Sequence, residues 1–243
     1  MLRYWRGRNG QVPDLPADSL RRLRGDARTL RREVEQFAAA ADLRLAELSL
    51  PAGGLAKPRM ADVVWRPAVW QARCATLARP GADGAIRLDS ETSLYHDCPL
   101  CEVTVRQIAA NGLTQTAPFG LLTEVYGFSG NYLSISVRLP DSLVTGTGGR
   151  HILAVELTAD CENPINMLAR LNIAHGPDVA QLVQDLAHRG GSARRLAEFD
   201  LGHAGLNEKR MDKIWIDIFF QAPALNRIVV SDLILSRRPR AEL

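Results

Sequence analysis

The sequence has no long apolar run and few cysteines, and each scarcity excludes a class of protein. Across 243 residues, no stretch approaches the roughly 18 apolar residues that a membrane-spanning helix requires. Four cysteines are too few for a disulfide framework in a chain of this length, which indicates a reducing environment. The first residues also lack the continuous apolar segment of a secretory signal. We therefore expect a soluble, cytoplasmic protein without a transmembrane segment.

Metal ligands are scarce as well. The best candidates are His96, Cys98 and Cys101, which form one Cys-x-x-Cys pair with a neighbouring histidine. A structural zinc site usually takes its four ligands from two such pairs, and no second pair has matching spacing. The sequence therefore predicts no metal site and no other cofactor.

Charge is distributed unevenly along the chain, whose formal net charge is +3. Residues 1–32 contain nine arginines and three aspartates, a surplus of six positive charges, so the remainder carries a net charge of −3. Such arginines could contact phosphates or an anionic membrane surface, although a solvated helix face is the commoner explanation. Because no nucleic-acid-binding module accompanies them, we expect no specific nucleic-acid partner.

Residues 18–50 have the periodicity of one long amphipathic helix, which follows a basic N-terminal segment of residues 1–17. Apolar side chains recur in steps of three and four, as in a heptad seam. They are Leu20, Leu23, Ala27, Leu30, Val34, Phe37 and Ala41. About three heptads is the threshold for a coiled coil, so this stripe could dock onto the body of the protein, self-associate or bind a partner protein.

Residues 51–93 contain proline, glycine and arginine without sustained periodicity, which predicts a connector packed on the core and anchored by Trp65 and Trp70. Residues 94–243 alternate with a period of two, which predicts strands. The expected strands are 102–106, 121–128, 132–139, 152–158, 168–174, 196–201, 213–220 and 228–236. Residues 179–186 fit a helix or a strand, and the preceding turn favours a strand.

Many short strands with glycine and proline turns favour an antiparallel β-sandwich of the jelly-roll kind. The turns at 127–131 and 175–178 have residues typical of hairpins. The predicted fold is therefore mostly β, with a sandwich domain over 94–243 that is preceded by one long amphipathic helix.

Polar residues on one face of several strands form the best candidate site. Each alternates with apolar neighbours, so each points away from the core. The five are Glu156, Arg170, Asn172, Trp215 and Asp217. If their strands adjoin, one sheet face combines hydrogen-bonding groups with an aromatic ring, the mixture that binds sugars. A solvated outer face is the alternative reading.

Paired carboxylates could instead perform glycoside hydrolysis, with Glu124, Glu156 or Asp217 as acid and nucleophile. The sequence gives no distance between these three groups. We therefore assign no catalytic residue and expect a protein that binds without catalysis.

Four segments of the chain are distinctive: 94–98 (LYHDC), 169–177 (ARLNIAHGP), 206–210 (LNEKR) and 236–243 (SRRPRAEL). In these segments the chain resembles an uncharacterised alphaproteobacterial protein family of the Rhodobacter group. The resemblance implies one architectural unit of unknown function and transfers no catalytic residue. The strand 228–236 is also similar to the last strand of galactose-binding-like and carbohydrate-binding jelly rolls, an analogy of fold alone.

Two functional hypotheses follow. The first is a carbohydrate ligand on the polar sheet face. The second is a scaffold or interaction protein whose helix binds a protein partner or a second copy through Leu20, Leu23, Leu30, Val34 and Phe37. The expected lack of an export signal favours the scaffold, and an unrecognised hydrolase is a third alternative.

Overall fold

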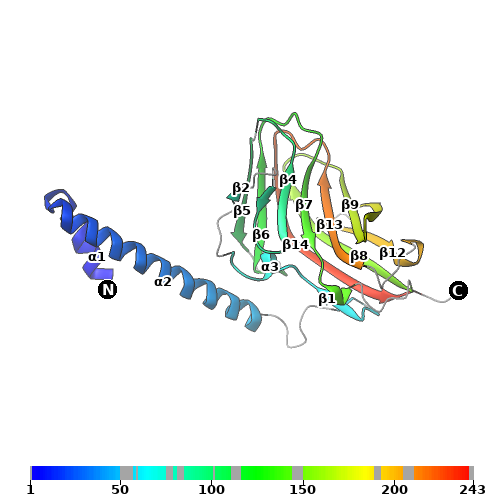
Figure 1. The fold of residues 1–243 in the computed structure, drawn as a ribbon, viewed down its shortest axis with the longest axis horizontal. Coiled ribbons are helices and arrows are strands. Elements are labelled where there is room, and N and C mark those ends of the chain that lie inside the picture. The colour runs from blue at the N-terminus through cyan, green and yellow to red at the C-terminus, as the bar shows by residue number, and fades with distance from the viewer. Residues whose placement is uncertain are drawn as a thin grey trace. The chain divides into compact units, whose positions relative to one another are not determined.

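The structure, a computed structural model, describes residues 2–49, 57–58, 60–74, 79–80, 85–100, 102–110, 116–143, 150–188, 193–204 and 211–240. The chain divides into two compact units, Met1–Asp42 and Leu43–Leu243. The predicted fold class is confirmed, because two antiparallel sheets form a sandwich and one long helix precedes them (Figure 1).

The N-terminal unit is helical. It contains α1 (Leu2–Asn9), the short 3-10 helix η1 (Val12–Asp14) and most of α2 (Ala17–Ser49). Pro16 stops the preceding turn, and its carbonyl accepts the first bond of α2 from the N–H of Leu20 at 3.0 Å. The predicted stop signal at 51–54 lies outside the described residues. Within the described part of the chain, no helix is long and apolar enough to cross a membrane.

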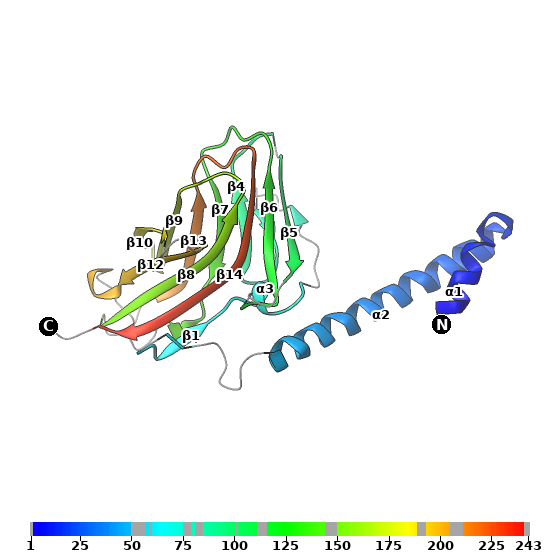
Figure 2. The ribbon, with the colours of Figure 1, turned by 180° about the vertical axis from the view of Figure 1, so that it is seen from behind.

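One sheet, here called the back sheet, has the strand order β11-β12-β8-β14-β6-β5, and β1 also pairs with β14. Its strands are β1 (Val63–Trp65), β5 (Val103–Ala109), β6 (Phe119–Val125), β8 (His151–Cys161), β11 (Ala187–His188), β12 (Arg194–Asp200) and β14 (Asn226–Pro239). Figure 2 shows its two longest strands, β8 and β14, side by side.

The other sheet, here called the groove sheet, has the order β10-β9-β13-β7-β4-β3-β2. Its strands are β2 (Arg79–Pro80), β3 (Ala85–Arg87), β4 (Thr92–His96), β7 (Leu133–Arg138), β9 (Met167–His175), β10 (Asp178–Asp185) and β13 (Met211–Phe220). Residues 179–186, which fitted a helix or a strand, thus lie almost entirely in a strand. The β9–β10 hairpin turns through Gly176 and Pro177, and Gly176 takes a φ of 60° that favours glycine.

The core lies between the two sheets and comes mainly from alternation along the strands, which a register shift between Val230 and Asp232 interrupts in β14. In β7, the side chains of Leu133, Ile135 and Val137 are buried, while Ser134, Ser136 and Arg138 occupy the opposite face. The same rule buries alternate residues of β8, β9, β13 and β14 in one apolar cluster. Each polar face is thereby directed outward, and the outward face of the groove sheet carries the candidate site.

The segment 51–93 differs from its predicted role as a connector on the surface, because it supplies strands to both sheets. It contains β1, β2, β3 and the start of β4, together with the short helix α3 (Ala68–Gln71). Trp70 is fully buried, and its Nε1 donates to the carbonyl of Val230 at 3.0 Å. Arg66 and Asp232 form a buried ion pair beside it. The strands are too short to show a period of two, since β2 and β3 have two and three residues.

Candidate functional site

The site is built on β13, which crosses the middle of the groove sheet. Ile214, Ile216 and Ile218 point into the core, so the residues between them point outward. These outward residues are Lys213, Trp215, Asp217 and Phe219, and all four line a groove.

Neighbouring strands extend this face in register. Trp215 lies opposite Arg138 of β7 on one side and Asn172 of β9 on the other. The next row across the sheet contains Arg170, Asp217, Ser136, Ser93 and Arg87. Because side chains directly opposite in antiparallel strands are about 5 Å apart at Cβ, residues distant in the sequence form one continuous surface.

The resulting groove has a volume of about 690 Å³ and three kinds of lining. The aromatic residues are Tyr95, Tyr132, Trp215 and Phe219. The hydroxyl residues, apart from tyrosine, are Ser90, Ser93, Ser134 and Ser136. The charged residues are Arg87, Glu91, Arg138, Arg170, Lys213 and Asp217.

Asp217 is held by a hydrogen-bond network at the floor of the groove. Asp217 is only 5% exposed. Its carboxylate accepts hydrogen bonds from Arg170 Nη2 at 3.0 Å and from Asn172 Nδ2 at 2.8 Å. Asn172 is fully buried, and its Oδ1 accepts from Gln181 Nε2 at 3.0 Å. The sequence predicted Asn172 as a ligand-binding residue, but its side chain is covered and cannot contact a ligand. Asn172 positions Asp217 instead.

Two cations lie over aromatic rings of the groove. The guanidinium of Arg170 is 4.6 Å from the ring centre of Phe219. The ammonium of Lys213 is 5.1 Å from the ring centre of Trp215. Such contacts are attractive because the ring face is electronegative. One face of the Trp215 ring is therefore occupied by the ammonium of the exposed Lys213.

The loop that carries Tyr132 into the groove is fixed by Asp97. Its Oδ1 accepts the backbone N–H groups of Asn131 and Tyr132 at 2.7 and 3.0 Å. The hydrogen bond from Tyr132 is the main reason why the pKa of the Asp97 carboxyl is lowered. A Cβ on Gly130 would lie 2.3 Å from Asp97 Oδ1, so only glycine fits there.

Glu91 lies at the edge of the groove beside Arg138. Burial raises the pKa of the Glu91 carboxyl, and the neighbouring Asp89 carboxylate raises it further. Arg138 acts in the opposite direction. The negative charge of Glu91 is thus held less readily than that of a solvated glutamate.

Glu156, the remaining predicted site residue, is not part of this groove. It lies on β8 of the back sheet and forms an ion pair with Arg194 of β12. The prediction assumed that all alternating strands adjoin. Alternation fixes which side of its own strand a residue occupies, but not the sheet to which the strand belongs.

Asp217 is separated from the other two carboxylates considered for hydrolysis. Glu124 lies on β6 of the back sheet near Thr104 and Arg106, whereas Asp217 lies on the groove sheet. Glu156 belongs to the back sheet as well. Asp217 therefore cannot act together with Glu124 or Glu156 as a pair of acid and nucleophile.

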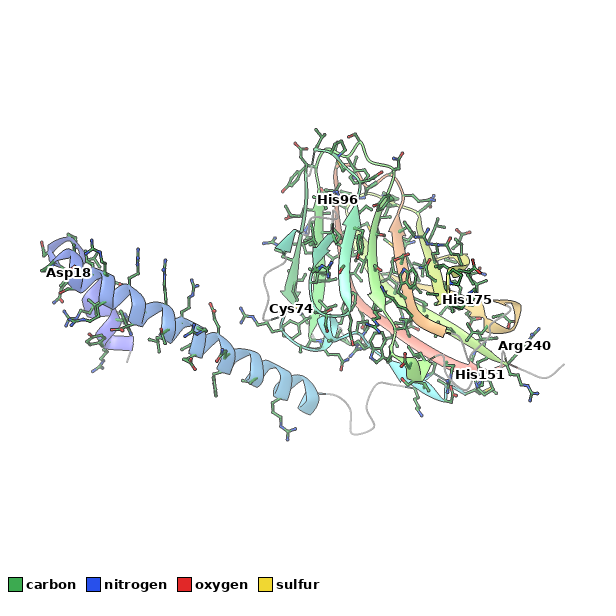
Figure 3. All side chains as sticks on the ribbon, in the orientation of Figure 1. Asp18, Cys74, His96, His151, His175 and Arg240 are labelled. Carbon is green, nitrogen blue, oxygen red and sulfur yellow. The ribbon has the colours of Figure 1, made fainter. Side chains whose placement is uncertain are left out.

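The described residues contain no group of three or more His, Cys, Asp or Glu side chains that could hold a metal ion. The labelled His96, His151 and His175 lie apart from one another (Figure 3). Cys98 is buried, and its Sγ lies 3.7 Å from the carbonyl oxygen of Gly127. Cys101 lies outside the described residues.

Several lining residues were absent from the predicted site. Lys213 and Phe219 lie an even number of residues from Trp215 on the same strand, and Ser136 and Arg138 alternate with buried residues of β7. Strand alternation could therefore have included all four. Arg87 and Tyr95 could not be found in this way. Arg87 lay in the predicted connector 51–93, and Tyr95 lay in the sandwich segment before its first predicted strand.

The described sandwich carries an open groove on one sheet, which defines it as a β-sandwich with a potential ligand-binding face. The chain belongs to the family of unknown function DUF6478, whose model matches residues 1–243. The curated proteins contain no significant match to this sequence.

Solved structures with a similar fold include carbohydrate-binding modules. The xylan-binding CBM22-1 domain of Paenibacillus barcinonensis Xyn10C is 10% identical, with a TM-score of 0.39 over 61% of this chain and 87% of that one. The family 11 carbohydrate-binding module of Clostridium thermocellum, in complex with a mixed-linked tetrasaccharide, is 13% identical, with a TM-score of 0.35 over 64% and 92%.

A third similar structure is the enzymatically active domain of tailspike protein 4 of bacteriophage CBA120. It is 9% identical, with a TM-score of 0.41 over 65% of this chain, which spans only 21% of the tailspike chain. All three likenesses concern the fold alone.

Proposed function

We propose that this protein binds a saccharide in the groove of its groove sheet. The observation that carries the proposal is the combination of aromatic rings and hydrogen-bonding groups in one groove of about 690 Å³. A sugar ring has an apolar C–H face that packs on an aromatic ring and hydroxyls that exchange hydrogen bonds with polar side chains. The volume lies within the usual range of small-ligand sites, about 300–1,000 Å³.

The floor of the groove is pre-organised for such a ligand. Asp217, Arg170 and Asn172 are connected by hydrogen bonds within the sheet, so binding does not have to order them. Strands hold their side chains more rigidly than loops do. Only the two edges of the groove, at Glu91 and Tyr132, come from connections between strands.

Replacing Trp215 with alanine tests the proposal. The ring is partly exposed in the groove and opposite Arg138, so its loss removes the largest stacking surface. We expect saccharide affinity to fall by about 30-fold, which corresponds to roughly 2 kcal/mol for a central aromatic residue. Affinity gel electrophoresis of the full chain against neutral and acidic polysaccharides measures this.

Trp215→Phe is the matched control, because it keeps an aromatic face at the same position and should retain most of the affinity. Tyr126→Phe, on an exposed residue outside the groove, should change nothing. An alanine variant that binds every polysaccharide as the parent does would contradict the proposal. So would a parent protein that no polysaccharide retards.

Self-association through α2 is the second candidate function. The helix carries Val34 and Phe37 with 55% and 76% of their surfaces exposed, in line with Leu20, Leu23 and Leu30. Exposed apolar side chains at heptad spacing favour pairing with another helix. Burial contributes about 25 cal/mol per Å² of apolar surface, more than exposed ion pairs supply.

Replacing Val34 and Phe37 together with serine should therefore convert an oligomer into a monomer. Sedimentation velocity across a range of protein concentrations measures the change. Arg21→Gln with Arg28→Gln, on exposed residues of the same helix, should alter only the salt dependence. A parent protein that stays monomeric at high concentration would rule out self-association through this stripe.

A further inference from the structure

The groove carries more positive than negative charge. Its lining contains four cationic side chains and two carboxylates. Of these, Asp217 and Arg170 form an ion pair in which Asp217 is buried, so their charges offset each other within the sheet. The other charged lining residues are Arg87, Glu91, Arg138 and Lys213.

Two of these cations flank the main aromatic ring. Arg138 is the direct cross-strand neighbour of Trp215, and the Lys213 ammonium lies 5.1 Å from the centre of the same ring. A sugar stacked on Trp215 would therefore place its substituents beside a guanidinium and an ammonium. Both groups are exposed, and a guanidinium matches the geometry of a carboxylate or sulfate with two parallel hydrogen bonds.

The position of Lys213 discriminates further between ligands. Its ammonium is attracted to the ring face that a sugar must occupy, so a bound sugar has to displace it. A neutral sugar offers the displaced ammonium only hydroxyls. An acidic substituent offers it an ion pair, which compensates for the lost contact with the ring.

We infer that the groove is selective for acidic saccharides, those bearing carboxylate or sulfate groups, with Arg138 and Lys213 as the residues that contact the acidic substituent. The inference rests on the proposed saccharide binding and narrows its ligand class. Glu91 opposes such a ligand by like charge, although burial and the neighbouring Asp89 raise the pKa of its carboxyl.

Matched pairs of saccharides test this inference on the full chain. Polygalacturonate is compared with its methyl ester, and carboxymethylcellulose with hydroxyethylcellulose, by affinity electrophoresis at low salt. Oligogalacturonate and its methyl ester are compared by calorimetry. We expect the acidic member of at least one pair to bind about tenfold more tightly, the ratio that one charge-assisted hydrogen bond supplies.

Variants identify the residues responsible. Arg138→Gln and Lys213→Gln should each lower the ratio of acidic to neutral affinity about tenfold. Lys213→Gln should also raise affinity for the neutral member, because it removes the cation that a neutral sugar has to displace from the ring. Glu91→Gln should raise affinity for the acidic member. Arg106→Gln removes an exposed positive charge from the back sheet and should have no effect. Thermal unfolding of each variant verifies that the fold is retained.

The outcomes separate this inference from the proposed function. Equal binding of neutral and acidic members, lost in Trp215→Ala, overturns the acidic preference and leaves saccharide binding standing. Binding of inorganic tripolyphosphate or single-stranded DNA as tight as that of any saccharide identifies a general polyanion site and overturns both. Failure of every saccharide to bind also overturns both.

Discussion

Replacing Asp232 with alanine should lower the free energy of unfolding by about 3–5 kcal/mol, the usual cost of leaving one member of a buried ion pair uncompensated. The Arg66 and Asp232 side chains are only 2% and 4% exposed. Two hydrogen bonds of 2.9 and 2.8 Å join them, and Thr116 also donates to Asp232. Without the carboxylate, the Arg66 guanidinium would remain buried with no counter-charge. Urea unfolding followed by tryptophan fluorescence measures the loss.

Two further variants isolate the effect of burial. Glu198→Ala breaks the pair with Arg238, whose side chains are 43% and 32% exposed, and should cost about 0–1 kcal/mol. Replacing both Arg66 and Asp232, with Met and Leu, should recover much of the stability, because no unpaired charge is left. A single Asp232→Ala variant as stable as Glu198→Ala would show that water reaches Arg66.

Replacing Trp70 with alanine should cost a similar amount, about 3–5 kcal/mol, the range for large aromatic residues in a core. Trp70 is fully buried, and α3, which carries it, packs against β6 and β14. The alanine variant creates a cavity and leaves the carbonyl of Val230 without its donor. Chemical denaturation at a fixed temperature measures the change.

Trp70→Phe keeps most of the volume but loses the Nε1 hydrogen bond, so it should lie between the parent and the alanine variant. Tyr126→Ala, at a side chain 54% exposed, should stay within about 0.5 kcal/mol of the parent. If Trp70→Ala unfolds at the parental urea concentration, the segment around α3 is a dispensable covering rather than part of the core.

Local pattern predicts the strands of this sandwich well, because alternation is a property of each strand alone. It predicted that Trp215 and Asp217 face outward, and both line the groove. It could not predict sheet membership, which depends on long-range pairing, and so it grouped Glu156 with residues of the other sheet.

The burial of an outward-facing side chain is the second property that the sequence pattern does not predict. Asn172 occupies an outward position, yet the neighbouring β10 and the side chains around it bury it completely. The sequence did not predict the short strands β2 and β3 for a third reason, because two or three residues cannot show periodicity. Their partners in the sheet, rather than their own residues, make them strands.

The central place of β14 in the back sheet has a consequence for synthesis on the ribosome. β14 pairs with β8 along one edge and with β6 and β1 along the other, yet it is made after all of these strands. Until it emerges, the long edges of β6 and β8 have no strand between them. Exposed strand edges of this kind recruit other chains, so the nascent protein is most vulnerable to aggregation between the synthesis of β8 and that of β14.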